Sequence, residues 1–120
     1  MAKARILIAD DEEGIRESLN LILGDAYELV FANDGEEALA RLQEDTFALA
    51  LVDIKMPKLD GLEVLRRLKG RLTTPVIVLT AYQSVELVRE TVRVGAVDYL
   101  LKPFERDLIL ETVEGLLSRR

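Results

Sequence analysis

Residues 48–53 read Ala-Leu-Ala-Leu-Val-Asp, an unbroken apolar run that ends in a carboxylate. Two other runs have the same form. Residues 6–9, Ile-Leu-Ile-Ala, are followed by two aspartates, and residues 76–79, Val-Ile-Val-Leu, are followed by a threonine. A strand with one wet face alternates apolar and polar residues, whereas a run that is apolar throughout is typical of a strand covered on both faces. These three segments therefore predict the central strands of a parallel sheet.

Longer amphipathic stretches separate the apolar runs and predict helices. Strand and helix alternate five times along the chain. Right-handed crossovers then place helices on both faces of one sheet, so we expect a single α/β, doubly wound domain over residues 1–120. The expected strands are 5–9, 28–32, 48–52, 75–79 and 97–101, and the expected helices are 12–24, 36–44, one that includes 62–68, 84–94 and 105–117.

Helix 84–94 carries more apolar residues than one core-facing stripe needs. Leu87 and Val94 fall outside the expected stripe. We therefore expect them to form, with Tyr99 of the next strand, an exposed surface for a partner or a second copy. The expected core-facing positions are Val85, Val88 and Val92 in this helix and Leu108, Val113 and Leu116 in helix 105–117.

The composition excludes several classes of function. The 120 residues include no cysteine and no histidine, which removes disulfides, thiol chemistry, imidazole–zinc sites and a Ser-His-Asp triad. Tryptophan is absent and the net charge is −6, so the chain lacks the stacking platforms and the basic surface that nucleic acid requires. The apolar runs are far shorter than the roughly 20 residues of a membrane span. We expect a cytoplasmic protein that binds neither membrane nor nucleic acid directly.

Polar side chains follow four of the expected strands at the points where they end. Asp10 and Asp11 follow the first strand, Asp53 the third, Thr80 the fourth and Lys102 the fifth. The carboxyl ends of strands line the functional crevice of open α/β sheets, so these side chains should converge. Three close carboxylates repel one another unless a cation lies among them, and their oxygens suit Mg²⁺. Without cysteine or histidine, a carboxylate is the expected nucleophile, and aspartyl phosphate is an established product of this chemistry.

Over residues 6–117 the combined motifs resemble the receiver domain of two-component response regulators. The resemblance implies a flavodoxin-like fold, with five helices around a five-stranded parallel sheet in the order 2-1-3-4-5. The matching motifs are 7–12 (Leu-Ile-Ala-Asp-Asp-Glu), 51–57 (Leu-Val-Asp-Ile-Lys-Met-Pro) with Asp60-Gly61, 78–81 (Val-Leu-Thr-Ala) and 95–104 (Gly-Ala-Val-Asp-Tyr-Leu-Leu-Lys-Pro-Phe).

The resemblance implies a role for each residue at the strand ends. Asp53 matches the phosphoacceptor. Asp10 and Asp11 match the acidic pair that holds Mg²⁺ or Mn²⁺ together with Asp53 and the backbone carbonyl of Lys55. Lys102 matches the lysine that pairs with the phosphoryl group.

The resemblance also implies a conformational switch. Thr80 matches the hydroxyl that moves toward the phosphoryl group, and Tyr99 matches the aromatic side chain whose burial follows that movement. Lys55 and Tyr82, two residues beyond Asp53 and Thr80, stand at positions that shape the access of water to the phosphoryl group.

The implied function is signalling rather than turnover of an external substrate. A histidine kinase or a phosphotransfer protein would supply the phosphoryl group, because this chain has no histidine. The domain would promote its own phosphorylation and dephosphorylation. The face formed by helix 84–94, strand 97–101 and helix 105–117 would then contact an output domain outside this chain, or a second copy, to control transcription.

Within the family, residues 80–88 and 96–104 are similar to receivers of enhancer-binding, AAA+-coupled regulators. Thr112 stands where winged-helix regulators usually carry an arginine, which argues against their charged dimer face.

Two other functions fit the pattern less well. A magnesium-dependent phosphatase or phosphotransferase for a small molecule would have a second aspartate two residues after the nucleophile, where this chain has Lys55. It would also need a cap domain, for which 120 residues leave no room. A flavodoxin-like nucleotide carrier would have a Ser/Thr/Gly-rich loop after the first strand, where residues 10–13 are all acidic and would repel a phosphate that lacks a metal.

Overall fold

The structure, a computed structural model, describes residues 2–82 and 84–118. Strands and helices alternate along the chain, as the sequence predicts. No helix in these ranges is long and apolar enough to cross a membrane. The strands are β1 (Arg5–Ala9), β2 (Glu28–Ala32), β3 (Leu49–Asp53), β4 (Val76–Thr80) and β5 (Asp98–Leu101). The helices are α1 (Glu13–Leu23), α2 (Gly35–Glu44), α3 (Gly61–Leu68), α4 (Val85–Arg93) and α5 (Arg106–Ser118).

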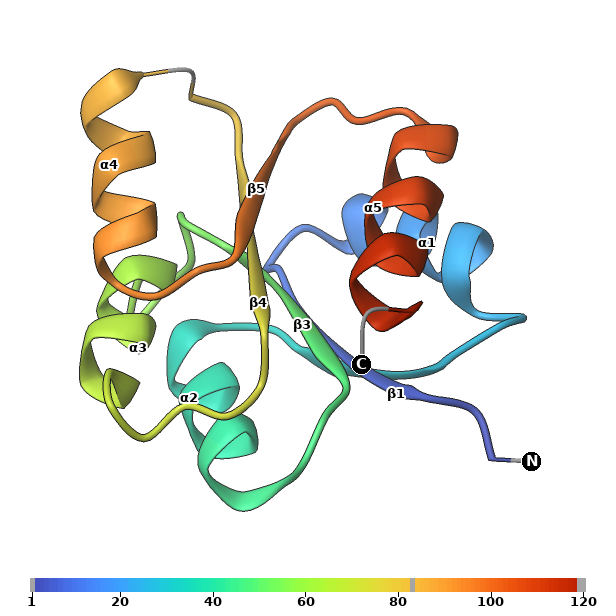
Figure 1. Ribbon diagram of the computed structural model, residues 1–120, viewed down its shortest axis with the longest axis horizontal. Helices are drawn as coiled ribbons and strands as arrows, with labels where there is room; N and C mark the ends of the chain where they lie inside the picture. The colour runs from blue at the N-terminus through green and yellow to red at the C-terminus, as the bar shows by residue number, and fades with distance from the viewer. Residues whose placement is uncertain (1, 83, 119–120) are drawn as a thin grey trace.

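The strands form one parallel sheet in the order β2-β1-β3-β4-β5, which confirms the predicted doubly wound, flavodoxin-like fold (Figure 1). β3 and β4 are buried along their whole length. Both end one residue later than predicted, because Asp53 pairs with Leu79 and Thr80 pairs with Leu101 in the ladder. Asp53 and Thr80 therefore belong to the sheet rather than to the loops that follow it.

Successive strand residues point to opposite faces of the sheet and build two separate cores. One core contains Leu7 and Val52 and is covered by α2, α3 and α4. The other contains Ile8 and Leu51 and is covered by α1 and α5 (Figure 1). Coverage on both faces explains why the central strands are apolar throughout.

Helix α4 lies on the sheet with a different face from the one predicted. Val85 and Val92 are 67% and 66% exposed, whereas Val94 is only 4% exposed and Leu87 packs against the core. Thr91 is also buried. Its hydroxyl donates to the Leu87 carbonyl at 2.8 Å, so the buried hydroxyl has a hydrogen-bond partner. A polar residue thus occupies a core position. The prediction that Val85 and Val92 face the core, and that Leu87 and Val94 form an exposed interface, is wrong.

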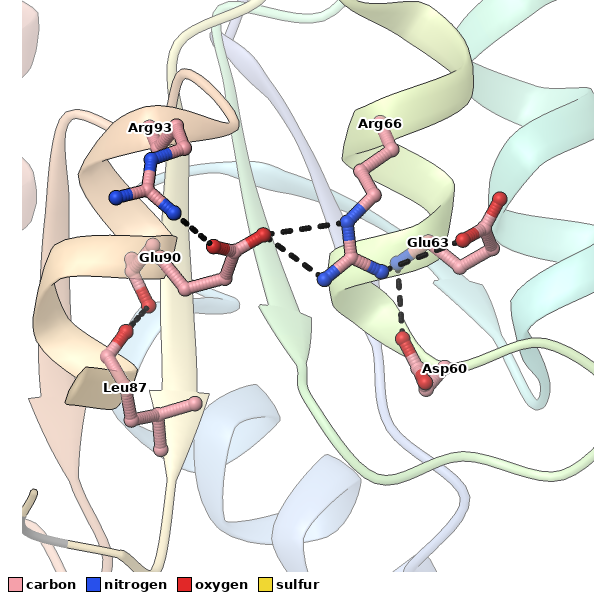
Figure 2. A network of polar contacts seen from close by, with 7 residues as sticks. Asp60, Glu63, Arg66, Leu87, Glu90 and Arg93 are labelled. Atoms are coloured by element: carbon pink, nitrogen blue, oxygen red, sulfur yellow. Dashed lines mark hydrogen bonds and ion pairs between the residues drawn. The ribbon is translucent and has the colours of Figure 1, made fainter.

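Charged residues tie α4 to α3 (Figure 2). Arg66 of α3 donates to Glu90 Oε1 of α4 through two nitrogens, at 2.9 and 3.2 Å. Glu63 and Arg93 extend this network, with ion pairs of 3.3 Å to Arg66 and 3.0 Å to Glu90. Ion pairs near the surface contribute at most about 1 kcal/mol each. The network therefore orients α4 on its neighbour more than it stabilises the domain.

Helix α5 differs from the prediction at one core position. Ile109 and Val113 are fully buried, whereas Leu108 is 47% exposed. Ile109 and Val113 are four residues apart and share one face of the helix, and Leu108 is rotated from Ile109 by about 100°. Leu116 packs against the same core, as predicted.

The loop between β3 and α3 is held close to the end of β3. The backbone N–H of Gly61 donates to the Ile54 carbonyl at 2.7 Å, and Asp60 caps α3 by accepting from the Glu63 N–H at 2.8 Å. A Cβ at residue 61 would lie only 2.2 Å from the carbonyl oxygen of Asp53. Glycine is required here because the two main chains are in direct contact.

Candidate functional site

The ends of the strands bring the predicted site residues to one edge of the sheet. Asp10 follows β1, Asp53 and Thr80 end β3 and β4, and Lys102 follows β5. The backbone N–H of Lys102 donates to the Thr80 carbonyl at 2.7 Å, which fixes Lys102 beside the end of β4. Asp10, Asp53 and Thr80 are at most 5% exposed. Asp11 is exposed at the rim.

The ammonium group of Lys102 lies at the centre of the site. Its nitrogen is 2.8 Å from Asp10 Oδ2, 3.1 Å from Asp53 Oδ2 and 3.3 Å from Glu12 Oε1. The lysine side chain is only 11% exposed, so water screens these contacts far less than it screens surface ion pairs. The sequence predicts the convergence of Lys102 with Asp10 and Asp53, but not its contact with Glu12.

Asp10 is held through both its side chain and its main chain. Its Oδ1 accepts from the Glu12 N–H at 2.9 Å. Its carbonyl oxygen accepts from Arg16 at 2.8 Å. Sequence reasoning missed Arg16. The signal that points to it is a basic residue one turn into the helix that follows the acidic pair.

Burial and like charge change the protonation of Asp53. Loss of hydration, followed by repulsion from Asp10, raises the pKa of Asp53 to about 6 even though Lys102 acts in the opposite direction. Burial lowers the pKa of Lys102, but its contacts with Asp10 and Asp53 outweigh this effect and raise the pKa above its ordinary value. Lys102 is therefore a permanent cation, and it does not fully neutralise the surrounding carboxylates.

The carboxylates fit a divalent cation. One oxygen from each of Asp10, Asp11 and Asp53 lies within 4.8 Å of the others. Asp10 Oδ2 is buried and, apart from its ion pair with Lys102, accepts no hydrogen bond from the described residues. An incompletely satisfied carboxylate oxygen in an excess of negative charge suits a hard cation such as Mg²⁺. Lys55 lines the same hollow, beside Asp11 and Asp53.

Lys55 and Tyr82 meet where the hollow opens. The ammonium nitrogen of Lys55 lies 4.8 Å from the centre of the Tyr82 ring, which is cation–π geometry. The Thr80 hydroxyl accepts from the Tyr82 N–H at 3.0 Å, so this hydroxyl is engaged by its own loop. All three residues line the hollow that contains Asp53.

Tyr99 lies on β5, away from the carboxylates. It is partly buried against the core that α4 covers. It pairs in the ladder with Val78, two residues before Thr80. Val94 belongs to the same core and Leu87 packs against it, so the two do not form an exposed surface with Tyr99.

A family model and the similar proteins of known sequence all indicate the same family. Residues 6–114 match the model of the response regulator receiver domain. The chain is 36% identical over 118 residues to the transcriptional regulatory protein ZraR of Salmonella typhimurium, which covers 97% of this chain and 27% of that protein. It is 42% identical over 117 residues to the response regulator MprA of Mycobacterium tuberculosis, which covers 96% of this chain and 51% of that protein. The chain therefore spans about a quarter to a half of the length of these relatives.

A solved structure extends the similarity to the fold. The receiver domain of the Francisella response regulator 1452 superposes with a TM-score of 0.91 at 34% sequence identity. The match covers 98% of each chain. The whole of this domain, and not only its strand-end motifs, is therefore similar to a receiver domain.

We expect Asp53→Asn to stabilise the protein when divalent cations are chelated. Folding raises the pKa of Asp53 from 3.8 to about 6, so the folded chain keeps a proton that the unfolded chain has lost. The contribution of Asp53 to stability therefore falls as the pH rises from about 4 to about 6 and stays low above that range. Asparagine has no charge to lose, so the variant should be more stable by about 1–3 kcal/mol at neutral pH.

Urea unfolding of both proteins in EDTA, from about pH 4 to about pH 8, measures this difference. Asp25→Asn, at an exposed carboxylate outside the cluster, controls for the loss of one negative charge. A stability difference between Asp53→Asn and the unmodified protein that stays constant across this pH range would contradict this account of the site.

Proposed function

The chain belongs to the response regulator receiver domain family, and on that premise we propose that Asp53 is its phosphoacceptor. The donor is the phosphohistidine of a histidine kinase or of a phosphotransfer protein, because this chain has no histidine of its own. The observation that carries the proposal is the setting of Asp53, a buried carboxylate that belongs to the acidic cluster and lies 3.1 Å from the ammonium group of Lys102. The domain promotes its own phosphorylation and dephosphorylation and turns over no external substrate.

The transfer exchanges one bond to phosphorus for another. An oxygen of Asp53 attacks phosphorus while the bond to the donor imidazole breaks, and the bonding electron pair returns to the imidazole nitrogen. Asp10, Asp11, Asp53 and the Lys55 carbonyl would hold Mg²⁺, which would supply positive charge next to the phosphoryl oxygens. Lys102 already lies 3.1 Å from Asp53 Oδ2, so it is placed to pair with a phosphoryl oxygen as negative charge gathers there.

Thr80 and Tyr99 connect phosphorylation to the outer surface. The Thr80 hydroxyl leaves the Tyr82 N–H and turns to a phosphoryl oxygen, and the Tyr99 ring moves inward into the space that opens. Helix α4 is suited to respond, because a narrow stripe of buried side chains and the Arg66–Glu90 pair attach it to the domain (Figure 2). A coupling of about 1–3 kcal/mol between site and surface is sufficient to bias such an element.

The face of α4, β5 and α5 is the proposed partner surface. Val85 and Val92 are exposed apolar residues of α4, and the partly buried Tyr99 contributes from β5. Because ZraR is a transcriptional regulatory protein, we propose that this face acts on an output domain, or on a second copy, to control transcription in the cytoplasm. Enhancer-binding regulators are the proposed subfamily, on the similarity of residues 80–88 and 96–104.

The pair formed by Lys55 and Tyr82 is proposed to control how long the phosphoryl group persists. The two side chains are exposed and line the hollow that contains Asp53, with the ammonium nitrogen 4.8 Å from the ring centre. In this position they limit the approach of water to the acyl phosphate of Asp53.

Acetyl phosphate should label the protein at Asp53, and only in the presence of Mg²⁺ or Mn²⁺. Intact-mass spectrometry should detect the addition of one phosphoryl group. Asp53→Asn should not be labelled, because the amide is a poor nucleophile, and Asp11→Asn should be labelled more slowly, because a cation ligand is lost. Asp25→Asn should be labelled like the unmodified protein. A label that persists in Asp53→Asn and maps to another residue would overturn the assignment.

Thr80→Ala should uncouple the site from α4. We expect beryllofluoride, a mimic of the phosphoryl group, to bind at Asp53 and to change the amide chemical shifts of Tyr99 and of α4. In Thr80→Ala the shifts at Asp53 should remain, while those of Tyr99 and α4 should be lost because no hydroxyl follows the phosphoryl group. Thr80→Ser keeps the hydroxyl and should transmit the change. Full transmission to α4 in Thr80→Ala would show that the coupling runs by another route, such as Lys102.

A further inference from the structure

The tip of the loop between β3 and α3 rests on the first turn of α2, more than twenty residues away in the sequence. The Pro57 carbonyl accepts two hydrogen bonds, from the Gly35 N–H at 3.2 Å and from the Leu59 N–H at 2.8 Å. Beside them, Lys58 Nζ lies 3.4 Å from Asp34 Oδ2. A main-chain hydrogen bond and an ion pair therefore fasten the same point of the loop to α2.

Asp34 joins the helix to the loop with one carboxylate. Its Oδ1 caps α2 by accepting from the Glu37 N–H at 2.8 Å. Its Oδ2 faces Lys58 of the loop. The side chain is only 17% exposed, so its position is restricted.

Gly35 leaves no space between α2 and the loop. A Cβ at this residue would lie 1.6 Å from the carbonyl oxygen of Leu59 and 2.7 Å from the Leu59 Cβ. Because the closest atom belongs to the main chain, any side chain at residue 35 must displace the loop itself. Lys58 has a φ of 71°, in the left-handed region, which shows that the loop is bent sharply at this contact.

The same loop leads to the acidic cluster. Lys55, Met56 and Pro57 line a hollow that also includes Asp11 and Asp60, next to the hollow that contains Asp53. Gly61 fixes the base of the loop at the Ile54 carbonyl. The main chain around Lys55 is thus held at two points, the base at Gly61 and the tip at α2.

We propose that Asp34 and Gly35 are positioning residues for the divalent-cation site. They do not touch the cation. By holding residues 57–59, they fix the main chain that brings Lys55 to the carboxylates. The inference rests on the proposed function, which places the Lys55 carbonyl among the cation ligands. Mg²⁺ and Mn²⁺ bind tightly only where their ligands are accurately placed, so a displaced loop should weaken binding.

Mn²⁺ alone is the probe, and its dissociation constant can be measured by electron paramagnetic resonance titration of the free ion. Gly35→Ala should weaken Mn²⁺ binding by about tenfold, the usual size of an effect transmitted through a supporting shell. Asp34→Asn keeps a capping oxygen but loses the ion pair, so it should weaken binding by about threefold, the contribution of one surface ion pair. Lys58→Met removes the same pair from the other side and should match Asp34→Asn.

Val113→Ala is the matched control, because Val113 is fully buried in the core on the opposite face of the sheet. It should lower stability in EDTA and leave Mn²⁺ affinity unchanged. If Gly35→Ala behaves in the same way, Gly35 has only a structural role and the inference is overturned. If Gly35→Ala does not fold, Asp34→Asn and Lys58→Met decide, and unchanged affinity in both overturns the inference.

The experiment also separates this inference from the proposed function. An unmodified protein that neither binds Mn²⁺ nor is labelled at Asp53 contradicts both. An unmodified protein that binds Mn²⁺ and is labelled, alongside variants with unaltered affinity, contradicts only the roles of Asp34 and Gly35.

Discussion

The ammonium group of Lys102 lies between carboxylates from two different strand ends, and the arrangement of the site depends on this contact. The strand order places β1 beside β3 and puts Lys102 after β5, so its side chain must extend past the end of β4 to reach Asp10 and Asp53. The bond from its N–H to the Thr80 carbonyl fixes the start of that path. One ammonium group faces several carboxylates, and burial together with repulsion from Asp10 raises the pKa of Asp53. The fold thus tolerates a repulsive site, which is typical of functional sites.

Two connections lead from this charged centre to the outer elements, and an ion pair links two of those elements. The loop after β4 carries Tyr82, whose N–H donates to the hydroxyl of Thr80 at the end of β4, and leads into α4. The loop after β3 abuts the main chain of α2 at Gly35 and leads into α3. The ion pair between Arg66 and Glu90 then links α3 to α4 (Figure 2). These contacts form two physical paths between the cluster and α4, one through the end of β4 and one through α3.

The residues at the strand ends were predictable because their positions depend only on where apolar runs stop, and parallel strands all end at the same edge. The face of α4 was not predictable in this way. Two stripes fit the helical period, and the sequence favoured the one with three valines. The structure instead buries the stripe that contains Leu87, Thr91 and Val94. Thr91 can take the place of an apolar residue there because its hydroxyl donates to the Leu87 carbonyl. The contact of Lys58 with Asp34 joins residues that are far apart in the sequence and meet only after folding, so no local pattern indicates it.

The central claim is that Asp53 is a buried carboxylate in an excess of negative charge that a divalent cation would offset. The most direct measurement is the titration of the Asp53 carboxyl carbon by NMR, in EDTA and again with Mg²⁺. This account predicts a midpoint of about 6 in EDTA, set by burial and by repulsion from Asp10. It also predicts a clear downward shift when Mg²⁺ is added. A midpoint near that of an ordinary aspartate, about 4, and unchanged by Mg²⁺, would contradict it.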